Sequence, residues 1–262
     1  MEPLCQRGGA SCGACCGLYN RRDFSAGAVA SELSRRTRAL AAVPRTREAF
    51  RAAGAALLAG VPEPLFPSVR VCPLLGYLDE ERRRVGCLAH PAVTGGADLR
   101  DCGAYDANIC ASFLCPSHSF LSEEEADVAA EACADWHLYG LVVTDVPFLR
   151  ACLAAVAALA GARVERRHLG HAPFRRALRH LLATKEELEP GSEGLFGAFR
   201  AGPHGDDLPR HIDYAALGRP PSPYDEILRS VGADPHSGND LDAVEAEVRR
   251  RLDACAAAFP QA

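Results

Sequence analysis

Several residue types are too scarce in this chain for some common functions. Lysine occurs once, as Lys185, and methionine once, as Met1. A Schiff-base lysine would therefore have to be Lys185, which lies in what reads as an ordinary charged helix end. The sequence argues against lysine-based covalent catalysis.

Long apolar runs and excess positive charge are also missing. The longest apolar run, residues 153–162, is too short to span a bilayer. The first residues lack the basic region and apolar run of a secretory signal. A net charge of −5 provides no electrostatic footprint for nucleic acid. We expect a cytoplasmic protein with neither a membrane nor a nucleic acid as partner.

Familiar catalytic motifs are absent as well. The chain has no Gly-x-Ser-x-Gly or zinc-protease motif. Its glycine pairs, at 8–9 and 95–96, do not lie between a strand and a helix, as a phosphate-binding loop would. Whether the protein is an enzyme is left open by these patterns.

Cysteine, by contrast, is abundant and grouped. Cys133, Cys152 and Cys255 lie in the later part of the chain, and we expect them to act as small core residues. The others precede residue 116: Cys5, Cys12, Cys15, Cys16, Cys72, Cys87, Cys102, Cys110 and Cys115. In a reducing compartment, clustered cysteines indicate metal or redox chemistry rather than disulfides. A disulfide between the adjacent Cys15 and Cys16 would be strained, so metal binding is the favoured interpretation.

The spacing of the thiols supports metal ligation. Cys12 and Cys15 form a Cys-x2-Cys pair, which lets both sulfurs face one metal. Adjacent side chains usually diverge, so Cys16 would reach a second metal or another iron of one cluster. Cys110 and Cys115 form a second local pair.

These motifs resemble those of the bacterial CxxCxxCC cysteine-cluster family (YkgJ-like), which is described as zinc- or iron-chelating. The matching motifs are Cys12-Gly13-Ala14-Cys15-Cys16, Cys72-Pro73-Leu74-Leu75, Cys87-Leu88-Ala89-His90 and the run from Cys110 to Cys115. The resemblance covers residues 5 to about 116. With the spacing, it indicates a ligand set of Cys5, Cys12, Cys15, Cys16, Cys72, Cys87, Cys110 and Cys115.

The chain departs from the family pattern in three places. Cys5 precedes Cys12 by seven positions instead of three. An insertion over 91–106 replaces an Arg-Pro element and adds Cys102, which could be a ligand or a bystander. Ala111 stands where the family has arginine. His90 is a further candidate ligand or, more readily, a hydrogen-bond partner of a ligand, and His118 is a further candidate ligand only.

Spacing does not decide which metal is bound. Eight thiolates could hold two zinc ions, one [4Fe–4S] cluster with one zinc, or two iron–sulfur clusters. Crowded thiolates slightly favour iron–sulfur. We therefore expect an iron–sulfur cluster or Zn²⁺ with a structural and possible redox role. The resemblance also leaves two alternatives: a protein-modifying enzyme similar to flagellin lysine N-methylase, and a metal-handling protein.

The predicted fold is mainly α (α+β), in two parts. Residues 1–121 form a loop-rich cysteine-cluster metal module, with helices over 25–42 and 44–59 and a short β-hairpin pairing 72–78 with 84–88. Residues 122–262 form a helical domain, a candidate surface for a protein partner. Its helices are expected over 122–139, 146–160, 173–188, 223–231 and 241–259. Residues 190–192 and 201–223 are expected to be connections rich in proline and glycine.

Histidine and aromatic groups in the helical part are expected to be structural. His168 and His171 lack a third ligand nearby, and the segment around them reads as an exposed link. Trp136, His137 and Tyr139 are expected in the core. The acidic run over 123–127 is interpreted as a helix start rather than a carboxylate site.

Overall fold

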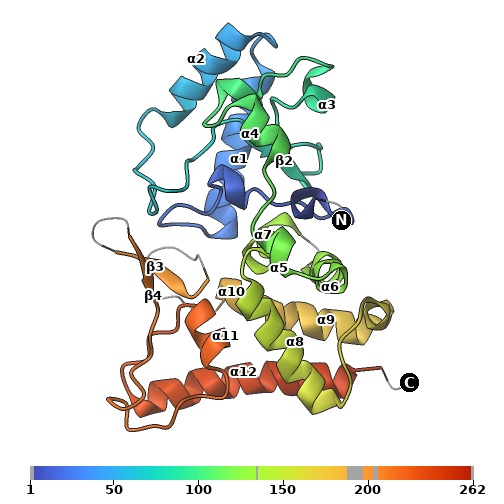
Figure 1. The fold of residues 1–262 in the computed structure, drawn as a ribbon, viewed down its shortest axis with the longest axis vertical. Helices are drawn as coiled ribbons and strands as arrows, with labels where there is room; N and C mark the ends of the chain where they lie inside the picture. The colour runs from blue at the N-terminus through green and yellow to red at the C-terminus, as the bar shows by residue number, and fades with distance from the viewer. Residues whose placement is uncertain (1–2, 134, 188–196, 203–205, 261–262) are drawn as a thin grey trace.

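A computed structural model describes residues 3–133, 135–187, 197–202 and 206–260. Most of these residues are helical, and the strands among them form two two-stranded antiparallel sheets. The molecule is elongated in Figure 1, with the cysteine-bearing segments mainly in the upper half and the longest helix at the bottom. The predicted mainly α class with a short β-hairpin is confirmed.

Two capped helices support the cysteine-bearing segments. Helix α1, Ala26–Ala41, begins where the Ser25 side chain accepts a hydrogen bond from the backbone N–H of Ala28. Helix α2, Arg47–Leu58, is capped by Thr46 in the same way, so it begins later than the predicted residue 44. The cap decides the start, because Thr46 is the first side chain that can satisfy the free N–H groups.

The predicted hairpin is present with shorter strands. Strand β1, Leu75–Tyr77, pairs antiparallel with β2, Val85–Cys87, and Leu75 lies opposite Cys87. The hydroxyl of Thr37 on α1 accepts a hydrogen bond from the Tyr77 N–H at 2.9 Å, which attaches the hairpin to the helix. The hairpin thereby places Cys87 beside the segment that follows Cys72.

Short helical turns carry most of the remaining cysteines. They are η1 (Leu4–Gln6), η2 (Ala14–Cys16), η3 (Arg100–Cys102) and α4 (Ala107–Ser112), and two further turns without cysteine are α3 (Pro91–Thr94) and α5 (Ser117–Phe120). The 91–106 insertion thus contains short helical turns that the sequence did not indicate.

One predicted helix proves to be two. Helix α6, Glu123–Cys133, starts with the predicted capping box, in which Ser122 and Glu125 exchange backbone-to-side-chain hydrogen bonds. A second helix, α7, runs over Trp136–Val143 and is capped by Asp135. The prediction of a single helix over 122–139 was wrong, because the Asp135 carboxylate accepts the N–H bonds of His137 and Leu138 and starts a new helix.

The remaining elements largely follow the sequence pattern. They are α8 (Val146–Ala160), η4 (Arg166–Gly170), α9 (Ala172–Leu182), α10 (Thr184–Glu187), β3 (Phe199–Ala201), β4 (Asp207–Pro209), α11 (Asp225–Ser230) and α12 (Gly238–Ala258). The predicted helix over 173–188 is interrupted at Ala183, its last residue lies outside the described residues, and so does the predicted connection at 190–192. Strands β3 and β4, in contrast, form a hairpin that the sequence did not indicate.

A continuous hydrophobic core joins the cysteine-bearing segments to the helices. Tyr19, Val29 and Val85 belong to the same buried cluster as Phe148 and Leu252. A smaller cluster lies between α1, α2 and the hairpin region. The predicted division of the chain at residue 121 stays a prediction, and the main core extends to both sides of it.

The apolar helices α7 and α8 are packed in this core. Among the described residues, no single helix has both the length and the apolar character needed to cross a membrane. Helices α7 and α8 reach that threshold only when joined, and they bend by 93° at the break between them.

Candidate metal centre

The Cys-x2-Cys segment forms a tight turn. In η2 the Cys16 N–H donates to the Gly13 carbonyl oxygen at 3.0 Å, and the Gly17 N–H donates to that of Ala14 at 2.8 Å. Gly17 has a φ of +75°, and a Cβ at this position would lie 2.6 Å from the Arg70 carbonyl oxygen. Only glycine suits both constraints, and it allows the Cys16 backbone to approach the segment leading to Cys72.

Backbone hydrogen bonds bring distant cysteines together. The Cys12 N–H donates to the Cys5 carbonyl oxygen at 3.1 Å, and the Cys72 N–H donates to that of Cys16 at 2.9 Å. The Cys72 carbonyl oxygen in turn accepts a bond from the buried Arg36 guanidinium on α1. Four cysteines from three segments are therefore positioned by the main chain and by one helix.

The thiols fall into two groups according to which of them influence one another electrostatically. Burial raises the pKa of Cys5 and Cys12 most, and Cys115 raises it further; for Cys15 the first cause is its hydrogen bond with Cys115. Burial is the first cause that raises the pKa of Cys16, and among the thiols Cys72, Cys87 and Cys110 contribute more than Cys12. We call Cys5, Cys12, Cys15 and Cys115 the first thiol group, and Cys16, Cys72, Cys87 and Cys110 the second thiol group. The groups adjoin where Cys15 and Cys16 are neighbours in the chain, and Cys15 also responds to Cys16.

Cys15 and Cys16 belong to different groups, as expected for diverging neighbours. The pair Cys110 and Cys115 is also divided between the two groups. The eight predicted ligands thus separate into two sets of four.

Burial keeps several of these thiols protonated in the absence of a charged partner. It raises the pKa of Cys12 and of Cys87 to about 12, and that of Cys16 well above its ordinary value. Backbone N–H groups two residues along the chain oppose this rise. The N–H of Ala14 donates to the Cys12 sulfur at 3.4 Å, and that of Ala89 donates to the Cys87 sulfur.

Cys115 is the thiol most easily ionised. Its pKa falls to about 6, first because Cys15 hydrogen bonds to its sulfur, and then because the Ser117 hydroxyl and N–H and the nearby His118 favour the thiolate. The same Cys15–Cys115 bond raises the pKa of Cys15. The pair therefore holds one thiolate and one thiol.

The thiols lie in two groups, but the side chains of a group are not yet placed as a complete set of metal ligands. In the described part of the chain, no three or more Cys, His, Asp or Glu side chains lie close enough together to enclose a metal ion. The donor set is nevertheless chemically suitable, because four thiolates are a complete ligand set for zinc or for an iron–sulfur cluster. Binding would require the four side chains of a group to close and to lose their protons.

The other candidate ligands occupy different positions. The Cys102 thiol donates to the Arg47 carbonyl oxygen at 3.5 Å, and its charged neighbours are Asp101, Arg51 and Arg47. His90 is exposed and caps α3, where its Nδ1 accepts the Ala92 N–H. Cys102 belongs to the same small buried cluster as Cys72, whereas no described side-chain contact joins His90 to the two thiol groups.

Arg100 is a neighbour of the second thiol group that the sequence did not indicate. Its guanidinium partly offsets the burial that raises the pKa of Cys87 and Cys110. Asp98 accepts two hydrogen bonds from it, at 2.9 and 2.6 Å, and holds it in place. Both residues lie in the insertion, where no periodic pattern marks them, so only the tertiary structure identifies them.

The expected core residues are confirmed, with one correction. Cys133, Cys152, Cys255, Trp136, His137 and Tyr139 are all buried. The reading of Lys185 as an ordinary charged helix end was wrong. Its side chain is 1% exposed, and Nζ donates to Asp145 Oδ2 at 2.6 Å and to the Ser230 carbonyl oxygen at 2.8 Å.

The histidines of the 165–171 segment have structural contacts. The His168 ring packs against Phe259 with 4.7 Å between ring centroids, and its Nδ1 accepts the Glu165 N–H. His171 Nδ1 lies 3.1 Å from the Ala258 carbonyl oxygen. These contacts agree with the expected structural role.

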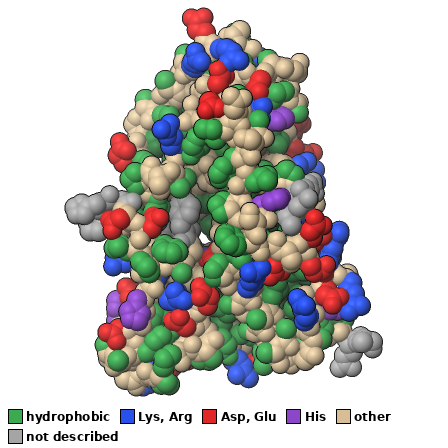
Figure 2. Space-filling model, viewed as in Figure 1, with side chains coloured by type: hydrophobic (Ala, Val, Ile, Leu, Met, Phe, Trp, Pro, Cys, Tyr) green, Lys and Arg blue, Asp and Glu red, His purple; other side chains and the backbone are tan. Residues whose placement is uncertain are grey.

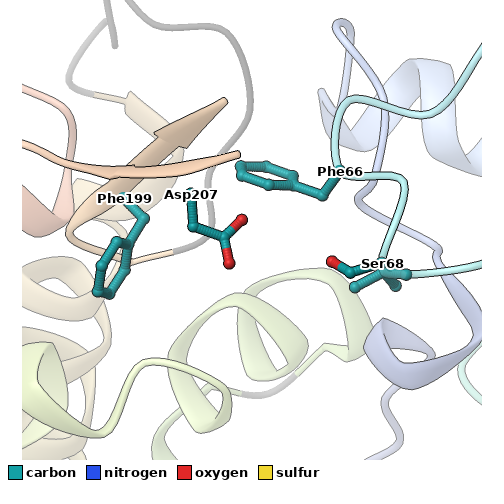
Figure 3. Close-up of a pocket in the computed structure, with 5 residues that line it drawn as sticks. Phe66, Ser68, Phe199 and Asp207 are labelled. Atoms are coloured by element: carbon teal, nitrogen blue, oxygen red, sulfur yellow. The ribbon is translucent and has the colours of Figure 1, made fainter. Parts of the chain in front are cut away.

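Two pockets lie away from the thiols. The first, of about 90 Å³, lies between the 66–69 loop and the β3–β4 hairpin and is lined by Phe66, Ser68, Val69, Phe199 and Asp207 (Figure 3). The second, of about 280 Å³, is lined by residues that include His211, Asp213, Asp234 and His236. Both are smaller than the usual small-molecule site of roughly 300–1,000 Å³. The thiol groups are therefore the better candidate site.

Comparisons of the chain with models of known protein families, with curated proteins and with solved structures gave no match. The resemblance to the cysteine-cluster family thus stays a prediction from the motifs.

Proposed function

We propose that this chain is a metal-binding protein in which each thiol group holds one zinc ion or one iron–sulfur cluster. The supporting observation is the separation of all eight predicted ligands into two sets of four, the number that one such centre needs. The N–H bonds to Cys12, Cys87 and Cys115 add support, since such bonds orient thiolate ligands and stabilise their charge.

The segment that carries two of the ligands supports the proposal independently. Residues 108–114 are all exposed, and α4 has no buried residue. Ile109, Phe113 and Leu114 keep about half of their surface in contact with solvent, so hydrophobic packing does little to hold this segment. Metal bonds to Cys110 and Cys115 would attach it to the 12–16 turn, to Cys72 and to Cys87.

The bound metal would stabilise this loop-rich region. A zinc ion would have a structural role only, whereas an iron–sulfur cluster could also carry an electron. Nothing in the described residues favours the methylase-like or the metal-handling alternative over this proposal.

The first test is metal, iron and acid-labile sulfide analysis of protein purified without oxygen, with a visible spectrum. Wild-type protein is expected to hold two centres. Cys15→Ala should remove the centre of the first group and Cys72→Ala that of the second, so each variant should retain the other centre. Cys255→Ala, which alters a buried core thiol, is the matched control and should retain both centres.

Two results would count against the proposal. Wild-type protein without metal would overturn the whole of it. A single substitution that removed both centres, while Cys255→Ala removed none, would overturn the two-group arrangement and leave metal binding in place.

A second test follows the exposed segment. Chymotrypsin should cut after Phe113 much faster once a chelator has removed the metal, whereas cleavage at Leu159 on α8 should not change. Equal rates at Phe113 with and without chelator would contradict the attachment of the segment by metal.

A further inference from the structure

His118 lies on α5, directly after the segment that carries Cys115. Its backbone N–H donates to the Cys115 carbonyl oxygen at 2.8 Å. Ser117, the residue before it, hydrogen bonds to the Cys115 sulfur through both its hydroxyl and its N–H. The turn that presents Cys115 to the first thiol group therefore also fixes the position of His118.

The imidazole of His118 has an unsatisfied nitrogen. Nε2 is buried and has no hydrogen-bond partner among the described residues. By comparison, the buried His137 uses both ring nitrogens, one with Glu186 and one with the Phe24 carbonyl oxygen. Leaving such a polar atom buried without a partner costs on the order of 1–3 kcal/mol, so a native protein usually supplies one.

A metal centre in the first thiol group would carry negative charge, which a nearby hydrogen-bond donor such as an imidazole N–H would offset. A zinc ion with four thiolates carries a charge of about −2, and so does an oxidised four-iron cluster with four thiolates. Donors and cations close to the sulfurs offset such charge. The second thiol group has Arg100 beside Cys87 and Cys110. Beside the first group, the corresponding residue is His118, which is held next to Cys115 by its backbone hydrogen bond and whose Nε2 has no partner among the described residues.

We propose that His118 Nε2–H donates a hydrogen bond to the metal centre of the first thiol group, either to a cysteine sulfur or to a cluster sulfide. His118 is then a positioning residue rather than a fifth ligand, because four thiolates already complete the coordination. This inference rests on the proposed function. It adds that the two centres differ, one being paired with an imidazole and the other with a guanidinium.

The test measures each centre separately. The Cys72→Ala background retains only the first centre, and the Cys15→Ala background retains only the second. In each background, His118→Ala, His118→Gln and His90→Ala are compared by competition with a metal chelator and, for an iron–sulfur centre, by the midpoint potential. Circular dichroism checks that each variant is folded.

In the Cys72→Ala background, His118→Ala should weaken metal binding roughly 10–100-fold, the usual effect of losing such a partner. His118→Gln keeps an N–H donor and should recover most of the affinity. His118→Ala should leave the second centre unchanged. His90→Ala, the matched control on α3, should change neither centre.

Three outcomes would overturn the inference. His118→Ala with wild-type affinity and potential at the first centre would show that Nε2 has no role there. Equal weakening of both centres would indicate a general structural effect. Wild-type protein that takes up no metal would overturn this inference together with the proposed function, whereas the first two results leave the proposed function intact.

Discussion

The buried pair of Lys185 and Asp145 is expected to be the most sensitive single contact in the helical part. Lys185 on α10 and Asp145 at the start of α8 are 1% and 3% exposed, and their charged atoms lie 2.6 Å apart. The ammonium group also donates to the Ser230 carbonyl oxygen at the end of α11. One side chain thus joins three helices, which meet in the lower half of Figure 1.

Asp145→Asn removes the negative charge and leaves the rest of the contact largely in place. The asparagine oxygen can still accept the Phe148 N–H, which Asp145 accepts at 3.2 Å, so the cap of α8 is kept. The ammonium of Lys185 then stays buried without its counter-charge. Breaking a buried pair in this way costs about 3–5 kcal/mol, or roughly 6–20 °C in Tm for a chain of this size.

Urea denaturation at pH 7, followed by Trp136 fluorescence and far-ultraviolet circular dichroism, measures this loss. Arg249 and Asp253 form an exposed pair on α12 with side chains 55% and 53% exposed, so Asp253→Asn is the matched control and should change stability by less than about 0.5 kcal/mol. The double variant Lys185→Met/Asp145→Asn should be more stable than Asp145→Asn alone, because no unpaired charge remains. A loss below about 1 kcal/mol for Asp145→Asn would refute the reasoning.

Three further predictions concern the contact between α6 and α8 and the thiol region. Arg150 holds the pKa of Glu125 at about 2, so the stabilisation is complete above about pH 4.5 and is lost as the pH falls towards 2. Glu125→Gln should cost about 1 kcal/mol at pH 7 and only a small fraction of that at pH 2, as measured by denaturation at both pH values. Gly17→Ala places a Cβ against the Arg70 carbonyl oxygen at positive φ, so it should cost about 1–3 kcal/mol and lower the metal content of the second group. Cys102→Ala should leave the metal content unchanged by elemental analysis, because this thiol donates to a carbonyl oxygen.

Each of these three predictions has a control variant or an outcome that would contradict it. Gly27 lies in α1 with open space around it, so Gly27→Ala should stabilise the protein slightly through helix propensity, in contrast to Gly17→Ala. An equal stability loss for Glu125→Gln at pH 7 and pH 2 would argue against a charge effect. Metal loss in Cys102→Ala would place that thiol among the ligands.

Figure 2 adds a surface feature that bears on the thiol region. Figure 2 has the same orientation as Figure 1, and it shows apolar side chains among charged ones on the face where α4 and α5 lie. Ile109, Phe113, Leu114 and Phe120 are the exposed apolar residues of this segment. They lie in the chain around Cys110 and Cys115.

Most helices could be predicted because their signals are local. Ser25 and Ser122 cap helices through bonds to residues three positions later, and the apolar spacing within α8 reflects a single buried face. The ligand list was likewise a matter of residue type and short spacing. Helix starts were misplaced where a competing cap, such as Asp135 or Thr46, lay inside a continuous helical pattern.

Local sequence signals therefore predicted most of the longer helices, the β1–β2 hairpin and the eight thiols proposed as ligands. Tertiary structure alone decided that Cys15 lies with Cys115 and Cys16 with Cys72, that Lys185 is buried against Asp145, and that Arg100 and His118 adjoin the thiols. The difference arises from how far apart in the sequence the interacting residues lie. A cap or a Cys-x2-Cys turn depends on residues within one helical turn, whereas residues 15 and 115 meet only after the core that joins both parts of the chain has formed.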